Sequence, residues 1–247
     1  MPLLETNELS KQFYKLVAVN RLDFQVEKGE MVGLIGPNGS GKTTFFNCVT
    51  HIYAPTSGRV FFKGNNITGR RPDQISRIGI GRTFQLIQLF PEMTVLENML
   101  MAVQEHQGNL ISRLFDRDET ANEKRALEIL EFLNIAHLRE ELAMNLSYGQ
   151  QKLLDFGMVL MPRPELVLLD EPTSGVEMEM RLKIMDYIRE LNRQGQTFVV
   201  IEHNMDVVMS LCERIVVLNY GQKIAEGTPQ QVQNNQEVID AYFGAEE

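Results

Sequence analysis

The sequence has no long apolar run and no block of basic residues. No apolar segment approaches the roughly 20 residues that a membrane-spanning helix needs, and no run of Lys and Arg is longer than the pair Arg70-Arg71. The net charge of −9 also argues against nucleic acid as a partner, because phosphate backbones bind to basic surfaces. We therefore expect a protein that binds no nucleic acid and that is soluble or is attached to a membrane only through a partner.

Cysteine is scarce as well. Cys48 and Cys212 lie far apart in apolar helical patterns, which predicts reduced, buried thiols rather than a disulfide or a metal site. The start of the chain, Met1 to Glu5, lacks the basic residues and apolar core of a secretory signal. We therefore expect no signal peptide. Because the chain ends soon after residue 243, we also expect no added regulatory domain.

Residues 36–44 form the strongest motif. They stand between two apolar stretches, Met31 to Ile35 and Phe45 to Val49, which is the pattern of a strand, a glycine-rich turn and a helix start. The spacing matches the phosphate-binding loop G-x-x-x-x-G-K-[ST]. The glycines let backbone N–H groups converge on a phosphate, and the helix N-terminus adds a positive dipole end. The predicted nucleoside triphosphate site comprises Gly36, Pro37, Asn38, Gly39, Ser40, Gly41, Lys42, Thr43 and Thr44, where Lys42 contacts the outer phosphates and the Thr43 hydroxyl is an oxygen ligand suited to Mg²⁺.

The rest of the chain alternates between strand and helix patterns, with one helical block inserted. The block covers residues 94–162: Thr94 and Glu97 have the spacing of a capping box, a helix is expected over 119–133 after an irregular polar stretch at 106–118, and a long helix begins at Ser147. Outside the block, strands are expected over 3–35, 59–63, 78–84, 166–170, 197–201, 214–219 and 222–226, with a turn at 64–66, and helices over 72–78, 178–193, 204–212 and 229–243.

A second nucleotide-binding element is the apolar run Leu166 to Leu169, which ends in Asp170 and Glu171. An uninterrupted apolar run is typical of a central strand in a parallel sheet, and ligands lie at the carboxyl ends of such strands. There Asp170 can hold Mg²⁺ through water and Glu171 can polarise an attacking water. Without the phosphate loop upstream, this run would indicate no more than a strand that ends in acidic residues. Phe13 and Tyr14 are also candidates, because either ring can stack on a base or fill a sheet edge.

These motifs together resemble the ATP-binding-cassette (ABC) ATPases. The phosphate loop, Gln85 after a strand, the segment Leu146-Ser147-Tyr148-Gly149-Gln150, Asp170-Glu171 and His203 occur in that family's order and spacing, over essentially the whole chain. Within the family the chain is most similar to the ATPase subunits of bacterial branched-chain amino acid importers. Lipopolysaccharide-transport ATPases have a close pattern. The narrower likeness rests on residues 81–85, 92–98, 201–205 and 235–244.

The resemblance implies an α/β fold: a phosphate-loop NTPase core with a mixed sheet, an antiparallel β subdomain and an inserted helical subdomain. The chain would then be a single ABC ATPase domain over 1–247, with the nucleotide-binding core and β subdomain at 1–93 and 163–247 and the helical signature subdomain at 94–162. It implies ATP hydrolysis with ATP and Mg²⁺ bound. Two subunits, identical or different, would pair head-to-tail around two ATPs.

The resemblance also implies roles for single residues. Phe13 matches the ring that stacks on adenine, with Tyr14 as the alternative, and Gln85 matches the glutamine that senses the metal and the attacking water. Glu171 matches the catalytic base and His203 the histidine that contacts the γ-phosphate. The predicted metal residues are Thr43, Gln85 and Asp170, and the residues expected to face ATP on a second subunit are Ser147, Gly149 and Gln150.

A membrane partner is implied too. Transmembrane permease subunits are expected to dock near Gln85 to Phe90, which places the protein peripherally on the cytoplasmic face of the bacterial inner membrane. We expect some of Leu86 to Phe90 to be exposed for this contact. We expect half or more of the surrounding apolar set to be core: Leu86, Ile87, Leu89, Phe90, Met93, Leu96, Met99 and Met101.

The chain departs from the family pattern in three ways: Tyr148 stands where glycine is usual, Glu177 stands where aspartate is usual, and Asn145-Leu146 and Lys152 replace more usual neighbours, to which we assign no meaning. The cargo and the direction of transport are not written in this subunit, so export of lipid or lipopolysaccharide stays an alternative to import of amino acids. A soluble cassette acting on DNA or the ribosome, and a regulatory module that holds ATP without hydrolysis, are further alternatives. Acidic charge and a single phosphate loop disfavour the first, and Glu171 and His203 disfavour the second.

Overall fold

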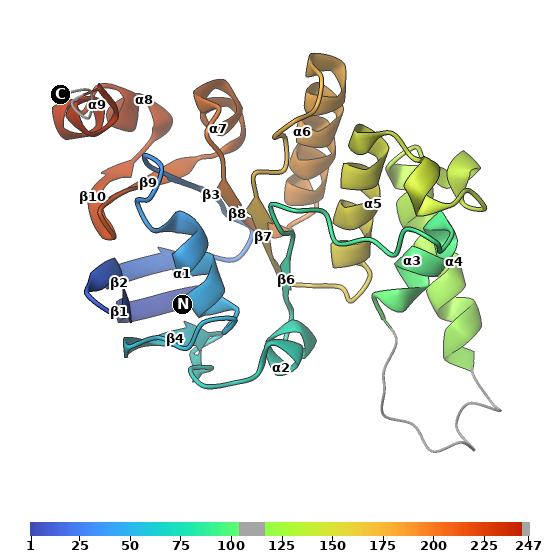
Figure 1. Ribbon diagram of the computed structural model, residues 1–247, viewed down its shortest axis with the longest axis horizontal. Coiled ribbons are helices and arrows are strands. Elements are labelled where there is room, and N and C mark those ends of the chain that lie inside the picture. Colours follow the sequence, from blue (N-terminus) through green and yellow to red (C-terminus); the bar gives the residue numbers. More distant parts are fainter. Residues whose placement is uncertain (104–116, 244–247) are drawn as a thin grey trace.

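Two β-sheets organise the computed structural model, which describes residues 1–103 and 117–243 (Figure 1). One sheet is antiparallel, with the order β2-β1-β4-β5. The other has the order β10-β9-β3-β8-β7-β6, and only the pair β10–β9 is antiparallel in its described part. The strands are β1 (Leu4–Phe13), β2 (Leu16–Val26), β3 (Met31–Ile35), β4 (Ser57–Phe62), β5 (Asn65–Asn66), β6 (Ile80–Arg82), β7 (Leu166–Asp170), β8 (Thr197–Ile201), β9 (Arg214–Asn219) and β10 (Gln222–Gly227).

Helices cover both faces of the mixed sheet. Helix α1 lies between the two sheets (Figure 1), α5 to α9 contribute to the core on the other face, and α3 and α4 pack against α5. The helices are α1 (Lys42–Val49), α2 (Pro72–Arg77), α3 (Val95–Met101), α4 (Arg117–Phe132), α5 (Tyr148–Leu160), α6 (Met178–Arg193), α7 (Met205–Leu211), α8 (Pro229–Gln233) and α9 (Gln236–Phe243).

The central strands are apolar at every position because both of their faces are buried. In β7, Leu166 and Leu168 join the core between the sheets, whereas Val167 and Leu169 join the core beneath the helices. All four are completely buried. Burial of one such side chain contributes about 1.5–3 kcal/mol, so the two clusters hold β7 and β8 rigidly in the middle of the sheet.

Local sequence signals account for several helix starts. Thr94 accepts from the Glu97 N–H and the Glu97 side chain accepts from the Thr94 N–H, so the predicted capping box is present. Ser147 caps α5 with the same reciprocal arrangement through Gln150. Each cap satisfies N–H groups that have no partner inside the helix.

Three details differ from the predictions. The strand expected over 78–84 covers only Ile80–Arg82, because the Thr83 hydroxyl accepts from the Asp170 N–H and replaces the next ladder bond. Asn65–Asn66 is a short strand paired with β4 rather than a turn. Helix α4 begins at Arg117, not 119, while residues 106–116 of the predicted irregular stretch lie outside the described part. The division into a core and a helical subdomain at residues 94–162 stays a prediction.

Candidate functional site

The parallel strands bring the predicted site residues to one edge of the sheet. The phosphate loop follows β3, Glu171 follows β7 and His203 follows β8. Since β8 lies between β3 and β7 and all three are parallel, their carboxyl ends meet at the same edge. Gln85 reaches this edge from the segment after β6. Residues separated by up to about 170 positions in sequence therefore share one site.

Glycine is required at two positions of the phosphate loop. Gly36 and Gly41 have φ angles of 149° and 104°, which side chains disfavour. A Cβ atom at Gly36 would overlap the carbonyl oxygen of Leu218, and one at Gly41 would overlap that of Ala18. The loop is thus pressed against β9 and β2.

Lys42 is folded back onto its own loop. Its ammonium donates to the carbonyl oxygens of Gly36 and Pro37 at 2.7 and 2.9 Å and to the Ser40 hydroxyl at 3.3 Å. Burial lowers the pKa of Lys42, and the facing carboxylates of Glu171 and Asp170 oppose that shift. The cation therefore points into a site with two negative groups, held by weak acceptors that a phosphate can replace.

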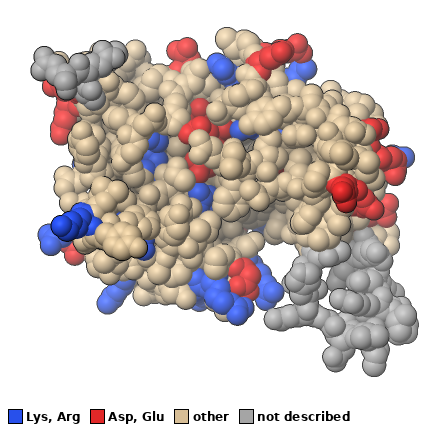
Figure 2. All heavy atoms as spheres, viewed as in Figure 1, with Lys and Arg blue, Asp and Glu red and all other residues tan. Residues whose placement is uncertain are grey.

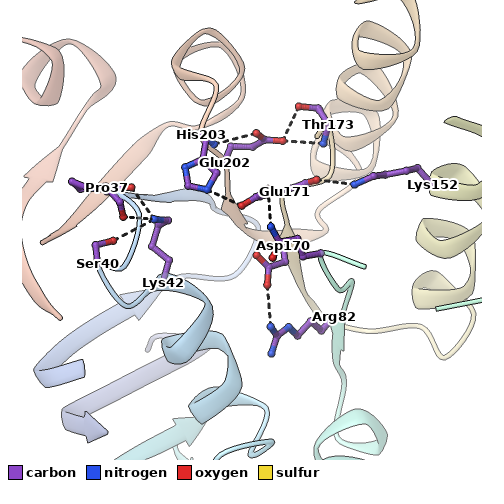
Figure 3. Close-up of polar contacts among 12 residues, drawn as sticks. Pro37, Ser40, Lys42, Arg82, Lys152, Asp170, Glu171, Thr173, Glu202 and His203 are labelled. Atoms are coloured by element: carbon purple, nitrogen blue, oxygen red, sulfur yellow. Dashed lines mark hydrogen bonds and ion pairs between the residues drawn. The ribbon is translucent and has the colours of Figure 1, made fainter. Parts of the chain in front are cut away.

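His203 and Gln85 both contact the Glu171 carboxylate, and Figure 3 shows the contact with His203. His203 Nε2 lies 2.7 Å from Glu171 Oε1, and the Gln85 amide donates to Glu171 Oε2 at 3.4 Å. Glu171 has a left-handed backbone with φ 52°, which costs a residue with a side chain about 1–2 kcal/mol. Two hydrogen bonds hold this conformation: the Glu171 N–H donates to the Ile201 carbonyl, and the Ser174 N–H donates to the Glu171 carbonyl.

The structure adds two groups that sequence reasoning did not assign. Lys152, on α5, donates to the Glu171 carbonyl at 3.0 Å (Figure 3), and burial lowers the pKa of this lysine while four nearby carboxylates oppose the shift. Glu202 accepts from the Thr173 N–H and hydroxyl at 2.9 and 2.7 Å and from the His203 N–H at 3.2 Å. The only sequence signal for Glu202 is a carboxylate at the end of an apolar strand, beside His203.

Asp170 has the chemistry of a metal ligand. One of its oxygens, Oδ2, is 3.0 Å from Arg82 Nη2, whereas the buried Oδ1 has no hydrogen-bond partner among the described residues. Within residues 1–103 and 117–243, no three His, Cys, Asp or Glu residues cluster closely enough to hold a metal unaided. Mg²⁺ in nucleotide sites uses one or two side-chain oxygens plus phosphates and water. Asp170 and the exposed Thr43 fit that donor set.

The remaining candidates lie elsewhere. Ser147, Gly149 and Gln150 begin α5, which stands beside α6 and away from α1 (Figure 1), and Gly149 packs against Met180 of α6. Tyr148 points toward Gly175 and is 46% exposed. The segment that opens α5 thus faces outward rather than toward the phosphate loop of its own chain.

The two aromatic candidates differ in setting. Tyr14 is 99% exposed at the turn between β1 and β2. Phe13 is half-buried, meets Tyr53 edge to face at 5.2 Å, and has the Lys11 ammonium 4.8 Å from its ring centre. Phe13 is therefore the more firmly held of the two rings.

The apolar set after Gln85 is mostly outside the core, which corrects our expectation. Of its eight members only Met99 is fully buried, and Leu89 and Leu96 pack partly against the core. Leu86 and Phe90 are exposed, as expected. The reason is that residues 86–93 leave the sheet as an irregular segment instead of packing as a helix. Beside them lies a groove of about 320 Å³ whose lining includes Phe84, Gln88, Ala102, Asp155 and Met158.

The surface charge, the helix hydropathy and the cysteines can be compared with the sequence-based expectations. Figure 2 shows acidic and basic side chains interspersed on this face, rather than a continuous basic surface. None of the described helices, which leave out residues 104–116 and 244–247, is long and apolar enough to cross a bilayer. Both cysteines are free and buried, as predicted, and burial raises the pKa of Cys48 to about 11.

Comparison with known proteins decides the family. The family model described as ABC transporter matches residues 19–174. The chain belongs to the ABC transporter ATP-binding proteins. It is an ATPase subunit that binds ATP and couples its hydrolysis to transport, as the motifs predicted. Residues 222–247 also match the model described as branched-chain amino acid ATP-binding cassette transporter.

Relatives of this ABC ATPase match along their full length. It is 41% identical to the probable branched-chain amino acid transport ATP-binding protein LivG of Archaeoglobus fulgidus, covering 100% of this chain and 97% of the relative. It is 40% identical to the high-affinity LivG of Escherichia coli, covering 98% of each chain.

Solved structures support the same fold. The ADP conformation of an ATP-binding cassette of an ABC transporter has a TM-score of 0.88 and 36% identity, covering 99% of each chain. The dimeric structure of a bacterial ABC transporter cassette has a TM-score of 0.79 and 28% identity, covering 92% of this chain and 98% of that one. The predicted phosphate-loop NTPase fold is therefore confirmed.

Proposed function

We propose that this ABC ATPase drives the import of branched-chain or other amino acids, at the cytoplasmic face of the bacterial inner membrane. The cargo class is supported by the names of the full-length relatives and by the C-terminal family model. The peripheral location follows from the role of the chain as the ATPase subunit that works beside membrane permeases. The partner in the membrane is a pair of permease subunits.

The catalytic proposal rests on one observation: the phosphate loop, Glu171, His203 and Gln85 converge at one sheet edge. In our proposal Lys42 leaves the carbonyls of its loop and binds the outer phosphates of ATP. The N–H groups of residues 39–44 bind the phosphates at the start of α1.

Glu171 is the proposed catalytic base that orients the attacking water. For this it exchanges its contacts with His203 and Gln85, so that His203 reaches the γ-phosphate and Gln85 reaches the metal and the water. Thr43 and Asp170 would hold Mg²⁺, which when bound neutralises phosphate charge. Phe13 stacks on the adenine ring.

Two subunits complete each site in this proposal. Ser147, Gly149 and Gln150 lie at the outward-facing start of α5, where the positive end of the helix dipole attracts an anion. A second subunit, the same chain or a paralogue, brings its ATP to this helix start. Hydrolysis then removes the phosphate that both subunits contact, and the dimer opens.

The permease is proposed to bind in the groove beside Gln85 to Phe90. Phe84 and Gln88 line a largely apolar groove that is large enough for a few side chains, and Leu86 and Phe90 are exposed in the same segment. A helix inserted there would contact the segment that carries Gln85, so permease motion and the site would be linked.

The cargo proposal is tested by the membrane protein that co-purifies with the chain from native membranes. We expect a permease pair whose reconstituted complex takes up leucine in an ATP-dependent way, with no uptake by the complex carrying Glu171→Gln. Recovery of a lipid or lipopolysaccharide exporter, or of ribosomes or DNA without any membrane protein, would contradict it.

A further inference from the structure

Arg82 occupies an unusual position for a charged residue. It is the last residue of β6, an edge strand, and its register partner is Leu168 of β7. Its side chain is nevertheless only 5% exposed. A buried guanidinium is costly unless its donors are used. Its Nε has no hydrogen-bond partner among the described residues, so the partners of its two terminal nitrogens show what it holds.

The guanidinium joins three elements of the site. Nη2 contacts Asp170 Oδ2 at 3.0 Å, while Nη1 donates to Asn47 Oδ1 at 2.7 Å and to Thr50 Oγ1 at 3.2 Å (Figure 3 shows the first contact). The rings of Phe46 and Phe84 lie 5.4 and 5.0 Å from it. Asn47 and Thr50 belong to α1 and its C-terminal cap, the helix that begins at Lys42. Arg82 therefore ties the end of β7 to the helix of the phosphate loop.

The ion pair with Arg82 uses only one of the two carboxylate oxygens of Asp170. Arg82 engages Oδ2, and Oδ1 is buried without a hydrogen-bond partner among the described residues. A planar guanidinium held by three hydrogen-bond partners restricts the rotation of the carboxylate more than a flexible ammonium can. Thus one oxygen is held, and the other is available to a ligand.

We propose that Arg82 is a positioning residue that orients the Asp170 carboxylate so that its free oxygen serves the metal of the nucleotide site. This rests on the proposed role of Asp170 in holding Mg²⁺. Groups that orient a metal ligand typically change metal affinity about 10- to 100-fold when they are removed. A residue that only pinned β6 to α1 would change stability without changing metal affinity.

The test measures metal binding rather than turnover. Mn²⁺ replaces Mg²⁺, and its electron paramagnetic resonance signal is followed as Mn²⁺ is added to the full chain with ADP. ADP affinity without metal is measured in parallel. We expect Arg82→Met to raise the half-saturating Mn²⁺ concentration about tenfold and to leave metal-free ADP affinity within about twofold.

Two further variants separate positioning from pinning. Asn47→Ala removes the contact of Arg82 with α1 but keeps the contact of Arg82 with Asp170, so the half-saturating Mn²⁺ concentration should stay within about twofold of the parent. Arg82→Lys keeps the charge without the planar geometry and should raise the Mn²⁺ requirement about threefold, which keeps the test available if Arg82→Met does not fold. Arg70→Met, at an exposed arginine, is the matched control and should change nothing.

Three outcomes overturn the proposal or its basis. If neither Arg82 variant changes the Mn²⁺ requirement while Asp170→Asn raises it, Asp170 keeps its proposed metal role and Arg82 does not position it. If Asp170→Asn also changes nothing, the metal role of Asp170 fails and the inference fails with it. A shift from Asn47→Ala as large as that from Arg82→Met would show that pinning α1 explains the effect.

Discussion

The ammonium of Lys152 lies 3.0 Å from the main-chain carbonyl oxygen of Glu171. The two residues belong to different parts of the chain: Lys152 is in α5, which opens with the signature segment, and Glu171 follows β7. The contact therefore links the helix that faces a second subunit to the backbone of the proposed catalytic base. Any tilt of α5 against the sheet acts on this bond.

Replacement of Lys152 should impair turnover more than binding. Lys152→Met removes a charged donor, so we expect the free energy of unfolding to fall by about 2 kcal/mol. Misplacement of Glu171 should lower kcat at least about tenfold with little change in KM. Urea unfolding and steady-state phosphate release measure the two effects. Lys183→Met, which breaks only a surface pair with Glu179, should change neither, and a normal kcat in Lys152→Met would contradict the link.

Glu171→Gln should separate binding from hydrolysis. The amide cannot accept the proton of the attacking water, so we expect kcat to fall about 10²- to 10⁴-fold while ADP affinity is retained. With ATP, the variant should accumulate as a dimer on size-exclusion chromatography. Glu179→Gln, at an exposed position, is the control. Turnover of Glu171→Gln near that of the parent would remove Glu171 from the mechanism.

A mixing experiment tests whether each site is shared between subunits. Lys42→Ala impairs the phosphate loop and Gly149→Asp impairs the signature segment, so each variant alone should be inactive. A mixed dimer keeps one intact site, and random pairing should restore roughly a quarter of the parent ATPase activity. If the variants form mixed dimers and no activity returns, the shared site is wrong.

Gly36 and Gly39 should differ in their tolerance of alanine. A Cβ at Gly36 would overlap the Leu218 carbonyl, whereas at Gly39 nothing lies within 4 Å. We expect Gly36→Ala to lower the free energy of unfolding by more than about 2 kcal/mol and to abolish ADP binding. Gly39→Ala, with strain only from its φ of 77°, should cost about 1 kcal/mol. Calorimetry and urea unfolding compare them, and equal effects would contradict the packing argument.

Asp155 should make stability depend on pH. Burial raises its pKa from 3.8 to about 6, against the opposing effects of the Gln88 N–H and Lys152. Between pH 3.8 and about 6 the Asp155 carboxyl is therefore more protonated in the folded state than in the unfolded state. The contribution of Asp155 to the free energy of unfolding falls as pH rises through that range.

Asp155→Asn removes that dependence. Relative to the parent, the variant should gain on the order of 1–3 kcal/mol in unfolding free energy between pH 4 and pH 7, measured by urea unfolding at each pH. Asp186→Asn, at an exposed surface pair, should show no such trend. A parallel pH profile for Asp155→Asn and the parent would contradict the shift.

Contiguous elements of the site were predictable from the sequence. The phosphate loop needs glycines, a lysine and a helix start within nine residues, so its geometry depends on neighbouring residues in the sequence. The apolar run ending at Asp170 likewise shows a buried parallel strand, and Ser147 with Gln150 shows a helix start. These signals are local because backbone conformation and the burial of a strand leave their pattern in neighbouring residues.

Other features depended on strand order and side-chain reach. Half or more of the eight apolar residues between Leu86 and Met101 were expected in a core, yet most of them lie outside it, since apolar composition alone does not show which face is covered. Arg82, Lys152 and Glu202 were assigned no role from the sequence, because each acts through a partner brought near only when β6, β7 and β8 are adjacent.

The sequence by itself determined that this chain binds ATP, that it is an ABC ATPase and where its loops and helices begin, because those properties follow from local patterns of residues. Only the tertiary structure decided that Lys152 holds the Glu171 backbone, that Arg82 engages one oxygen of Asp170 and that α5 faces outward. Such contacts join residues far apart in sequence, and their geometry is set by the order in which the strands pack.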